Sequence, residues 1–130
     1  MNRLVHGIFH LLVSIILCTA SGRAASADKP AGNQEAVREM IEGYDYFLAE
    51  DYDQALAHLR RALELDKKNT YLKTLLAEVY YRKQEFDQVI KLVEPIAEAQ
   101  DSVDSKVYLL LAYSFQAKGN NGRAIDYYKK

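Results

Sequence analysis

Apolar and small residues recur at spacings of three and four along the segment from Gly43 to Asp66. In its second half they form one stripe: Tyr52, Ala55, Leu56, Leu59, Ala62 and Leu63. These positions lie on one face of an α-helix, so the stripe predicts an amphipathic helix that buries this face. Before it, Tyr46 follows the small residue Gly43 by three positions. The whole segment predicts a helix, a tight turn and a second helix.

The same skeleton occurs twice more along the chain. Ala77 stands 34 positions after Gly43, and Ala112 stands 35 positions after Ala77. The other positions of the skeleton are repeated at Tyr80, Val89, Val93 and Ile96, and then at Phe115 and Ala124. Helix–turn–helix units with a period of about 34 residues and this order of small and aromatic positions are typical of the tetratricopeptide repeat. The chain resembles the tetratricopeptide-repeat family, in its exported bacterial form.

This resemblance implies an all-α solenoid of about two and a half to three repeats over residues 34–130, preceded by a signal-peptide helix and a linker at 28–33. The repeats are expected at about 36–69, 70–103 and 105–130, and the last of them is incomplete. Six solenoid helices are expected: one from an N-cap at Asn33 to about Ala49, then Asp53–Asp66, Thr70–Lys83, Glu85–Ala99, Ser105–Lys118, and a last one from Asn121 or Gly122.

Gly43 is expected in the middle of its helix, where glycine costs about 1 kcal/mol relative to alanine. The repeat fold explains it, because the following helix packs closely there and leaves no room for a side chain. Ala77 and Ala112 occupy the same position in the other repeats. We also assign four larger side chains to the core: Ile41, Tyr46, Tyr80 and Phe115.

Pro95 falls inside the expected helix Glu85–Ala99. Proline cannot donate the backbone hydrogen bond to the carbonyl of Lys91 and therefore bends or interrupts a helix. The sequence predicts a kink between these two residues, or a break after which the helix restarts.

Composition is that of an ordinary globular chain, with 49% hydrophobic and 27% charged residues. The net charge of −1 supplies no basic surface for nucleic acid, which is therefore not expected as a partner. Tyrosine is the prevalent aromatic residue, with 10 copies against 4 phenylalanines and no tryptophan.

Residues 1–27 have the pattern of an export signal. An arginine precedes an apolar run at 7–17, and no acidic residue occurs before Asp28. Ala25 and Ala27 supply the small side chains that a signal peptidase needs. The segment predicts cleavage after Ala27 and a periplasmic or secreted protein, with membrane contact only through this segment.

Three other fates of this segment are open. A retained anchor would use Leu4–Ala20, but these 17 residues are shorter than the ~20 that a bilayer span needs. Lipidation would use Cys18, but the preceding Leu17 is larger than the residue that bacterial lipoprotein signals carry there. A second cleavage site is present at Cys18-Thr19-Ala20.

Residues that could support catalysis are few. His58 is the only histidine after the export signal; it lies off the apolar stripe, so we expect it on the surface and not in a catalytic triad. His6 and His10 are spaced like a metal pair but lie within the signal. An acidic cluster lacks the spacing of a calcium loop and is interpreted as charge at a helix N-terminus: Glu50, Asp51 and Asp53. We expect no enzyme, no metal and no cofactor.

In tetratricopeptide arrays the first helix of each repeat lines a concave groove that binds a protein or peptide segment. The resemblance places six binding residues in this groove: Tyr44, Phe47, Glu78, Tyr81, Arg82 and Tyr113. Its other positions are Met40, Leu48, Tyr71, Thr74, Lys106, Leu109 and Gln116. Tyrosine and arginine are frequent hot-spot residues because they offer a large contact area with few rotatable bonds.

One subclass of the family is disfavoured. Arrays that bind the acidic C-termini of cytosolic chaperones hold the carboxylate with a lysine, asparagine and arginine clamp. Here Met40 and Tyr44 occupy the first-repeat positions, and neither residue can hold a carboxylate.

The sequence therefore predicts a non-enzymatic, exported scaffold or adaptor that binds a partner segment in a tyrosine-rich groove. Two alternatives remain. The repeats are the recognition module of a longer exported enzyme, such as a peptidase or cell-wall hydrolase, or the incomplete third repeat pairs with a second copy in a homodimeric scaffold.

Overall fold

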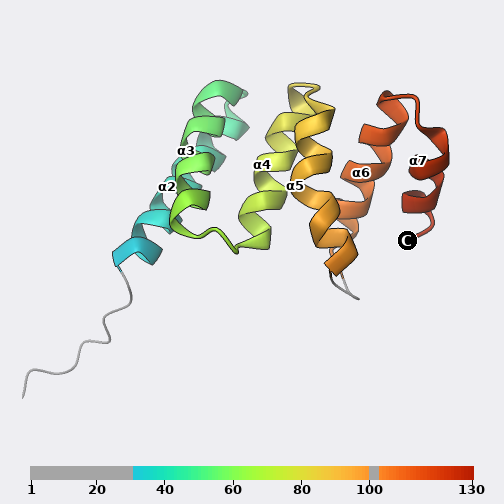
Figure 1. The fold of residues 1–130 in the computed structure, drawn as a ribbon. Coiled ribbons are helices and arrows are strands. Elements are labelled where there is room, and N and C mark those ends of the chain that lie inside the picture. The colour runs from blue at the N-terminus through green and yellow to red at the C-terminus, as the bar shows by residue number, and fades with distance from the viewer. Residues whose placement is uncertain (1–30, 100–102) are drawn as a thin grey trace, which may run out of the picture.

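The computed structural model describes residues 31–99 and 103–130, and this part of the chain is entirely helical (Figure 1). Its six helices stand side by side in chain order and form three antiparallel pairs. The helices are α2 (Ala31–Leu48), α3 (Tyr52–Leu65), α4 (Thr70–Arg82), α5 (Phe86–Ala99), α6 (Ser105–Ala117) and α7 (Asn121–Tyr128). The predicted helical solenoid is confirmed. The predicted signal and its cleavage and lipidation sites lie outside the described residues.

Side-chain caps start four of these helices. Asp51 accepts a hydrogen bond from the backbone N–H of Gln54 at 3.2 Å, and Asn69 accepts one from that of Leu72 at 3.1 Å. Asp104 and Asn120 cap α6 and α7 in the same manner. Each cap satisfies an N–H that has no partner within its helix, which explains why the helices begin where they do.

The beginning of α2 differs from the prediction. The helix starts at Ala31, so Asn33 lies inside it and is not its N-cap. The first helical turn thus takes up part of the segment that was expected to be a linker.

The turn within each repeat has the same unusual backbone. Glu50, Gln84 and Gly119 adopt positive φ values of 61°, 61° and 78°. In each case the next residue donates its N–H to the carbonyl of an aromatic residue five positions earlier, at 2.8–2.9 Å: Tyr46, Tyr80 or Phe115. This conformation favours glycine, which only the third repeat provides.

Replacing Gln84 with glycine should stabilise the protein by about 1 kcal/mol, because a residue with a Cβ is strained at φ 61°. The reverse change, Gly119→Ala, should destabilise it by a similar amount. Chemical denaturation followed by circular dichroism measures both effects. A loss of stability in Gln84→Gly would show that its side chain contributes more than the backbone strain removes.

Two ion pairs recur at equivalent places in successive repeats. Lys83 after α4 binds Asp53 at the start of α3, and Lys118 after α6 binds Asp87 at the start of α5. The hydrogen bond from Lys83 lowers the pKa of Asp53, whose carboxylate also lies in the first turn of its helix. These pairs link each repeat to the next.

The core follows the predicted stripe. Leu59, Val89 and Val93 have no exposed surface, and the small positions Ala77 and Ala112 are also fully buried. A Cβ added to Gly43 would lie 2.7 Å from Leu59 Cγ, so α2 and α3 approach each other as the glycine predicted. Tyr80 and Phe115 are buried, as expected.

The core assignment of Tyr46 and Ile41 is wrong. Their side chains are 38% and 53% exposed. Tyr80, which occupies the same repeat position as Tyr46, accepts hydrogen bonds from Arg60 on the preceding helix α3. Among the described residues no helix precedes α2, so nothing equivalent covers Tyr46.

Pro95 does not interrupt its helix. α5 continues through it from Phe86 to Ala99, which excludes the alternative of a break and restart. Pro95 is exposed, so its ring points away from the buried residues Val93 and Ile96. Within residues 31–99 and 103–130, no helix is long and apolar enough to span a lipid bilayer.

Candidate functional site: an aromatic groove

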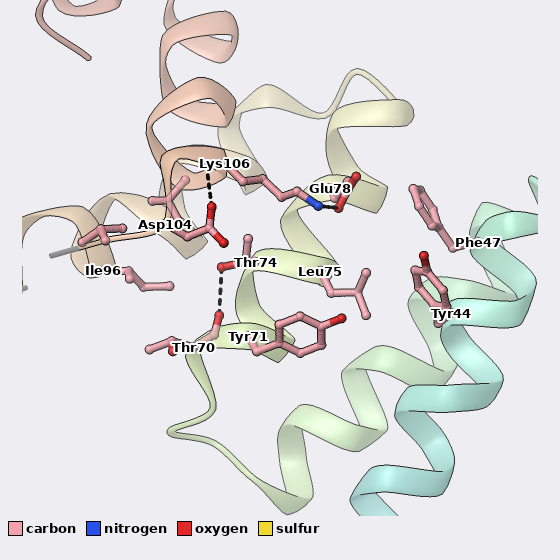
Figure 2. Close-up of a pocket in the computed structure, with 12 residues that line it drawn as sticks. Tyr44, Phe47, Thr70, Tyr71, Thr74, Leu75, Glu78, Ile96, Asp104 and Lys106 are labelled. Carbon is pink, nitrogen blue, oxygen red and sulfur yellow. Dashed lines mark hydrogen bonds and ion pairs between the residues drawn. The ribbon is translucent and has the colours of Figure 1, made fainter. Parts of the chain in front are cut away.

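A groove with a volume of about 300 Å³ opens between α2, α4 and the beginning of α6 (Figure 2). Tyr44 and Phe47 bound it from α2, and Tyr71 projects into it from α4. Tyr44 and Tyr71 are 42% and 62% exposed, so much of their ring surface is accessible. Leu75, Ile96, Val103 and Val107 supply its apolar lining. The groove therefore combines an apolar base with exposed aromatic walls.

An ion pair crosses the groove. Lys106 at the start of α6 donates a hydrogen bond to Glu78 of α4 at 3.1 Å, as Figure 2 shows. The hydrogen bond to Glu78 raises the pKa of Lys106. Asp104 also lines the groove beside Lys106, so the two carboxylates outnumber the one ammonium group and this part of the groove does not favour an anion.

Arg82 connects the groove to the aromatic residues beyond it. Its guanidinium carbon lies 5.9 Å from the ring centroid of Phe47, a cation–π distance. Tyr81 lies next to it in α4, and its ring is 6.1 Å from that of Tyr113 on α6. We call the set Tyr44, Phe47, Arg82, Tyr81 and Tyr113 the aromatic strip.

The strip extends to α7 through Tyr128, whose ring lies 5.7 Å from Tyr113 in an edge-to-face arrangement. The Tyr128 hydroxyl donates a hydrogen bond to Gln116 at 2.8 Å. Partial desolvation raises the pKa of Tyr128. Sequence reasoning missed this residue because it lies on the second helix of its repeat, and the resemblance places the groove on first helices only.

The six predicted binding residues divide into two groups. Tyr44, Phe47 and Glu78 line the groove itself. Tyr81, Arg82 and Tyr113 lie outside it but contact one another or Phe47. The groove also has lining residues that the prediction omitted: Thr70, Leu75, Ile96, Val103, Asp104 and Val107. Leu75 could have been found one helical turn after Tyr71, whereas Val103 lies in a connection without helical periodicity.

His58 is not the free surface residue that its position predicted. Its Nδ1 lies 2.8 Å from a carboxylate oxygen of Glu39 on α2, and its ring stacks on that of Tyr46 at 5.3 Å. The Glu39 side chain is only 5% exposed. The sequence pattern of α3 alone could not reveal this contact, because Glu39 belongs to another helix.

Comparison with known proteins supports the repeat pattern. A family model described as a tetratricopeptide repeat matches residues 46–113, which is 68 of the 130 residues. The matched region contains α3, α4 and α5 and most of α6. Repeats of this kind form protein–protein interaction modules.

Heat shock protein STI1 of Saccharomyces cerevisiae is 29% identical to this chain over 109 residues. The similarity covers 79% of this chain but 18% of the yeast protein. The chain therefore corresponds to less than a fifth of the length of this relative.

Proposed function

This chain belongs to the tetratricopeptide-repeat family, and on that premise we propose that it is an exported, non-enzymatic adaptor that holds a partner's protein segment against the aromatic strip. The observation that carries the proposal is that three successive first helices, α2, α4 and α6, each present an exposed aromatic ring on this side: Tyr44, Tyr71 and Tyr113. Aromatic rings next to a cation–π arginine are a typical composition for interface hot spots.

The chemistry of the groove favours a segment with apolar or aromatic side chains. Tyr44, Phe47 and Tyr71 offer ring faces, and Leu75 and Ile96 offer aliphatic contacts. Lys106 is paired with Glu78 and has Asp104 beside it, so the groove has no net positive charge to select an acidic terminus. A partner's main chain has polar neighbours in Thr74 and in the tyrosine hydroxyls, which can fix its register.

Replacing Tyr44 and Tyr81 together with alanine should weaken partner binding at least about 30-fold, since truncation of a hot-spot residue costs about 2 kcal/mol or more. The partner is first recovered with the wild-type chain and identified. Its binding segment is then titrated by calorimetry against the wild-type chain and the variant.

Tyr46→Ala is the matched control, because Tyr46 is an exposed tyrosine of the same helix that stacks on His58 and does not line the groove. This variant should bind the segment as the wild type does. Equal affinities for Tyr44→Ala/Tyr81→Ala and the wild type would refute the assignment of the binding surface.

Export is part of the same proposal and rests on the pattern of residues 1–27. Intact mass measurement of the protein recovered from outside the cytoplasm should show cleavage after Ala27. A lipid mass on Cys18 would instead place the adaptor at a membrane surface. A full-length cytoplasmic chain would contradict export while leaving the aromatic strip open to the binding test.

A further inference from the structure

Three side chains with metal-binding atoms meet between α2 and α3, away from the aromatic strip. Glu39 and Glu42 lie three positions apart on α2 and thus on the same face of the helix. Glu39 Oε2 and Glu42 Oε2 lie 2.8 Å and 3.3 Å from Nδ1 of His58 on α3. All three ligand atoms lie within 4.8 Å of one another.

Two carboxylates lie close to the same nitrogen, Nδ1 of His58, and one proton cannot form a hydrogen bond to both. An imidazole nitrogen carries at most one hydrogen, so only one of the two carboxylates can accept a full hydrogen bond from it. The Glu39 side chain is only 5% exposed, and Arg61 and Arg38 lie 3.4 Å and 3.9 Å from its Oε1, so Oε2 is the oxygen that faces the imidazole. A divalent cation between the three atoms would satisfy both carboxylates at once.

The surroundings hold the three groups in position. The other oxygen of Glu39, Oε1, lies 3.4 Å from Nε of Arg61, so this arginine orients the carboxylate from the side that faces away from His58. The ring of Tyr46 stacks on the imidazole at 5.3 Å and restrains its rotation. Such outer contacts are the usual means by which proteins orient metal ligands.

We propose that Glu39, Glu42 and His58 form a binding site for a divalent transition metal, with zinc as the best match. Zinc binds histidine nitrogen and carboxylate oxygen at about 2.0–2.1 Å, which puts tetrahedral ligand atoms about 3.3 Å apart. Oε2 of Glu42 already lies at this distance from Nδ1 of His58. Oε2 of Glu39 would have to move about half an ångström farther from Nδ1. Three protein ligands leave a fourth position for water.

A metal at this site would link the two helices of the first pair. Ligands at i and i+3 on one helix, combined with a ligand from the facing helix, are a common way to build metal sites in helical bundles. The ion would tie α2 to α3 without entering the groove. The proposal does not depend on the function of the aromatic strip, so either can fail alone.

Calorimetric titration of the chelator-treated full chain with zinc should show one site that depends on His58. His58→Gln and Glu42→Gln should each weaken it more than about tenfold, since even loss of an outer-shell partner costs about 10–100-fold in affinity. Glu42 is about half exposed, so its variant remains folded even if the change at His58 disturbs packing. Cobalt absorption provides a second readout, because it reports tetrahedral nitrogen and oxygen coordination directly.

Two control variants separate this site from other zinc ligands. Glu64→Gln removes an exposed carboxylate of α3 outside the cluster and should leave zinc affinity unchanged. His6→Gln/His10→Gln removes the other imidazoles of the chain and should retain the site. The proposal is overturned if the wild type takes up no zinc at millimolar concentration, or if Glu42→Gln and His58→Gln bind zinc as tightly as the wild type.

Discussion

Gly43→Ala should destabilise the wild-type protein by about 1–2 kcal/mol, although alanine is the better helix former. The added Cβ would lie 2.7 Å from Leu59 Cγ and 3.2 Å from His58 Cβ. Overpacking of this kind costs about 1–3 kcal/mol, which exceeds the gain of about 1 kcal/mol in helix propensity. Leu59 has no exposed surface and cannot turn toward solvent.

The effect of Gly43→Ala on stability should change from destabilising to stabilising when Leu59 is also shortened. Leu59→Ala alone should cost about 2–5 kcal/mol, because it leaves a cavity in a fully buried place. In that background the Cβ at position 43 enters the vacated space, so Gly43→Ala should stabilise by up to about 1 kcal/mol. A double-mutant cycle by chemical denaturation measures the coupling between the two positions.

Gly122→Ala is the reference for helix propensity without a clash. A Cβ there would meet only Asn120 Oδ1 at 3.9 Å, so this variant should gain a few tenths to about 1 kcal/mol. A Gly43→Ala protein more stable than the wild type, or additive effects in the cycle, would show that the close approach of α2 and α3 does not select glycine.

Phe115→Ala should destabilise the protein by about 3–5 kcal/mol and release α7. Phe115 is 6% exposed, its ring stacks on Tyr127 at 5.7 Å, and the guanidinium carbon of Arg123 lies 4.4 Å from its centroid. α7 has eight residues, too few to remain helical without packing. Amide hydrogen exchange should therefore show loss of protection over residues 121–128 before the rest of the solenoid opens.

Tyr127→Phe separates the ring contact from the polar contact. It removes a hydroxyl that lies 3.2 Å from Glu94 but keeps the stack on Phe115. The expected loss is about 1 kcal/mol or less, with α7 still protected. Normal protection of α7 in Phe115→Ala would contradict this prediction. It would mean that Ala124 and the ion pair between Arg123 and Glu94 are enough to hold α7 in place.

Much of the fold followed from local periodicity. The stripe through Leu59 predicted α3 and its buried face, and the glycine at 43 predicted where α2 and α3 approach. The helix predicted from Thr70 begins there, and Asn69 directly before it is its cap. The stripe and the cap depend on residues within a turn or two of each other, so helical geometry determines them directly, whereas the close approach at Gly43 followed from the resemblance to the repeat fold.

The candidate site was only partly accessible from the sequence. The family resemblance put Tyr44, Phe47 and Glu78 on one surface, and the structure places all three on the groove. It could not show that Tyr128 extends the strip or that Val103 lines the groove. Both depend on how neighbouring helices and a connection are placed, which no residue pattern within one helix specifies.

The sequence by itself determined the apolar faces of α3 and α5 and which positions must be small. Only the tertiary structure decided what covers those faces. Tyr46 and Tyr80 share one repeat position, but Tyr80 is buried beside Arg60 and Tyr46 is not. His58 and Glu39, 19 positions apart, meet only because α3 folds back on α2. Burial and pairing depend on neighbours that are distant in the chain, and periodicity within a helix does not encode them.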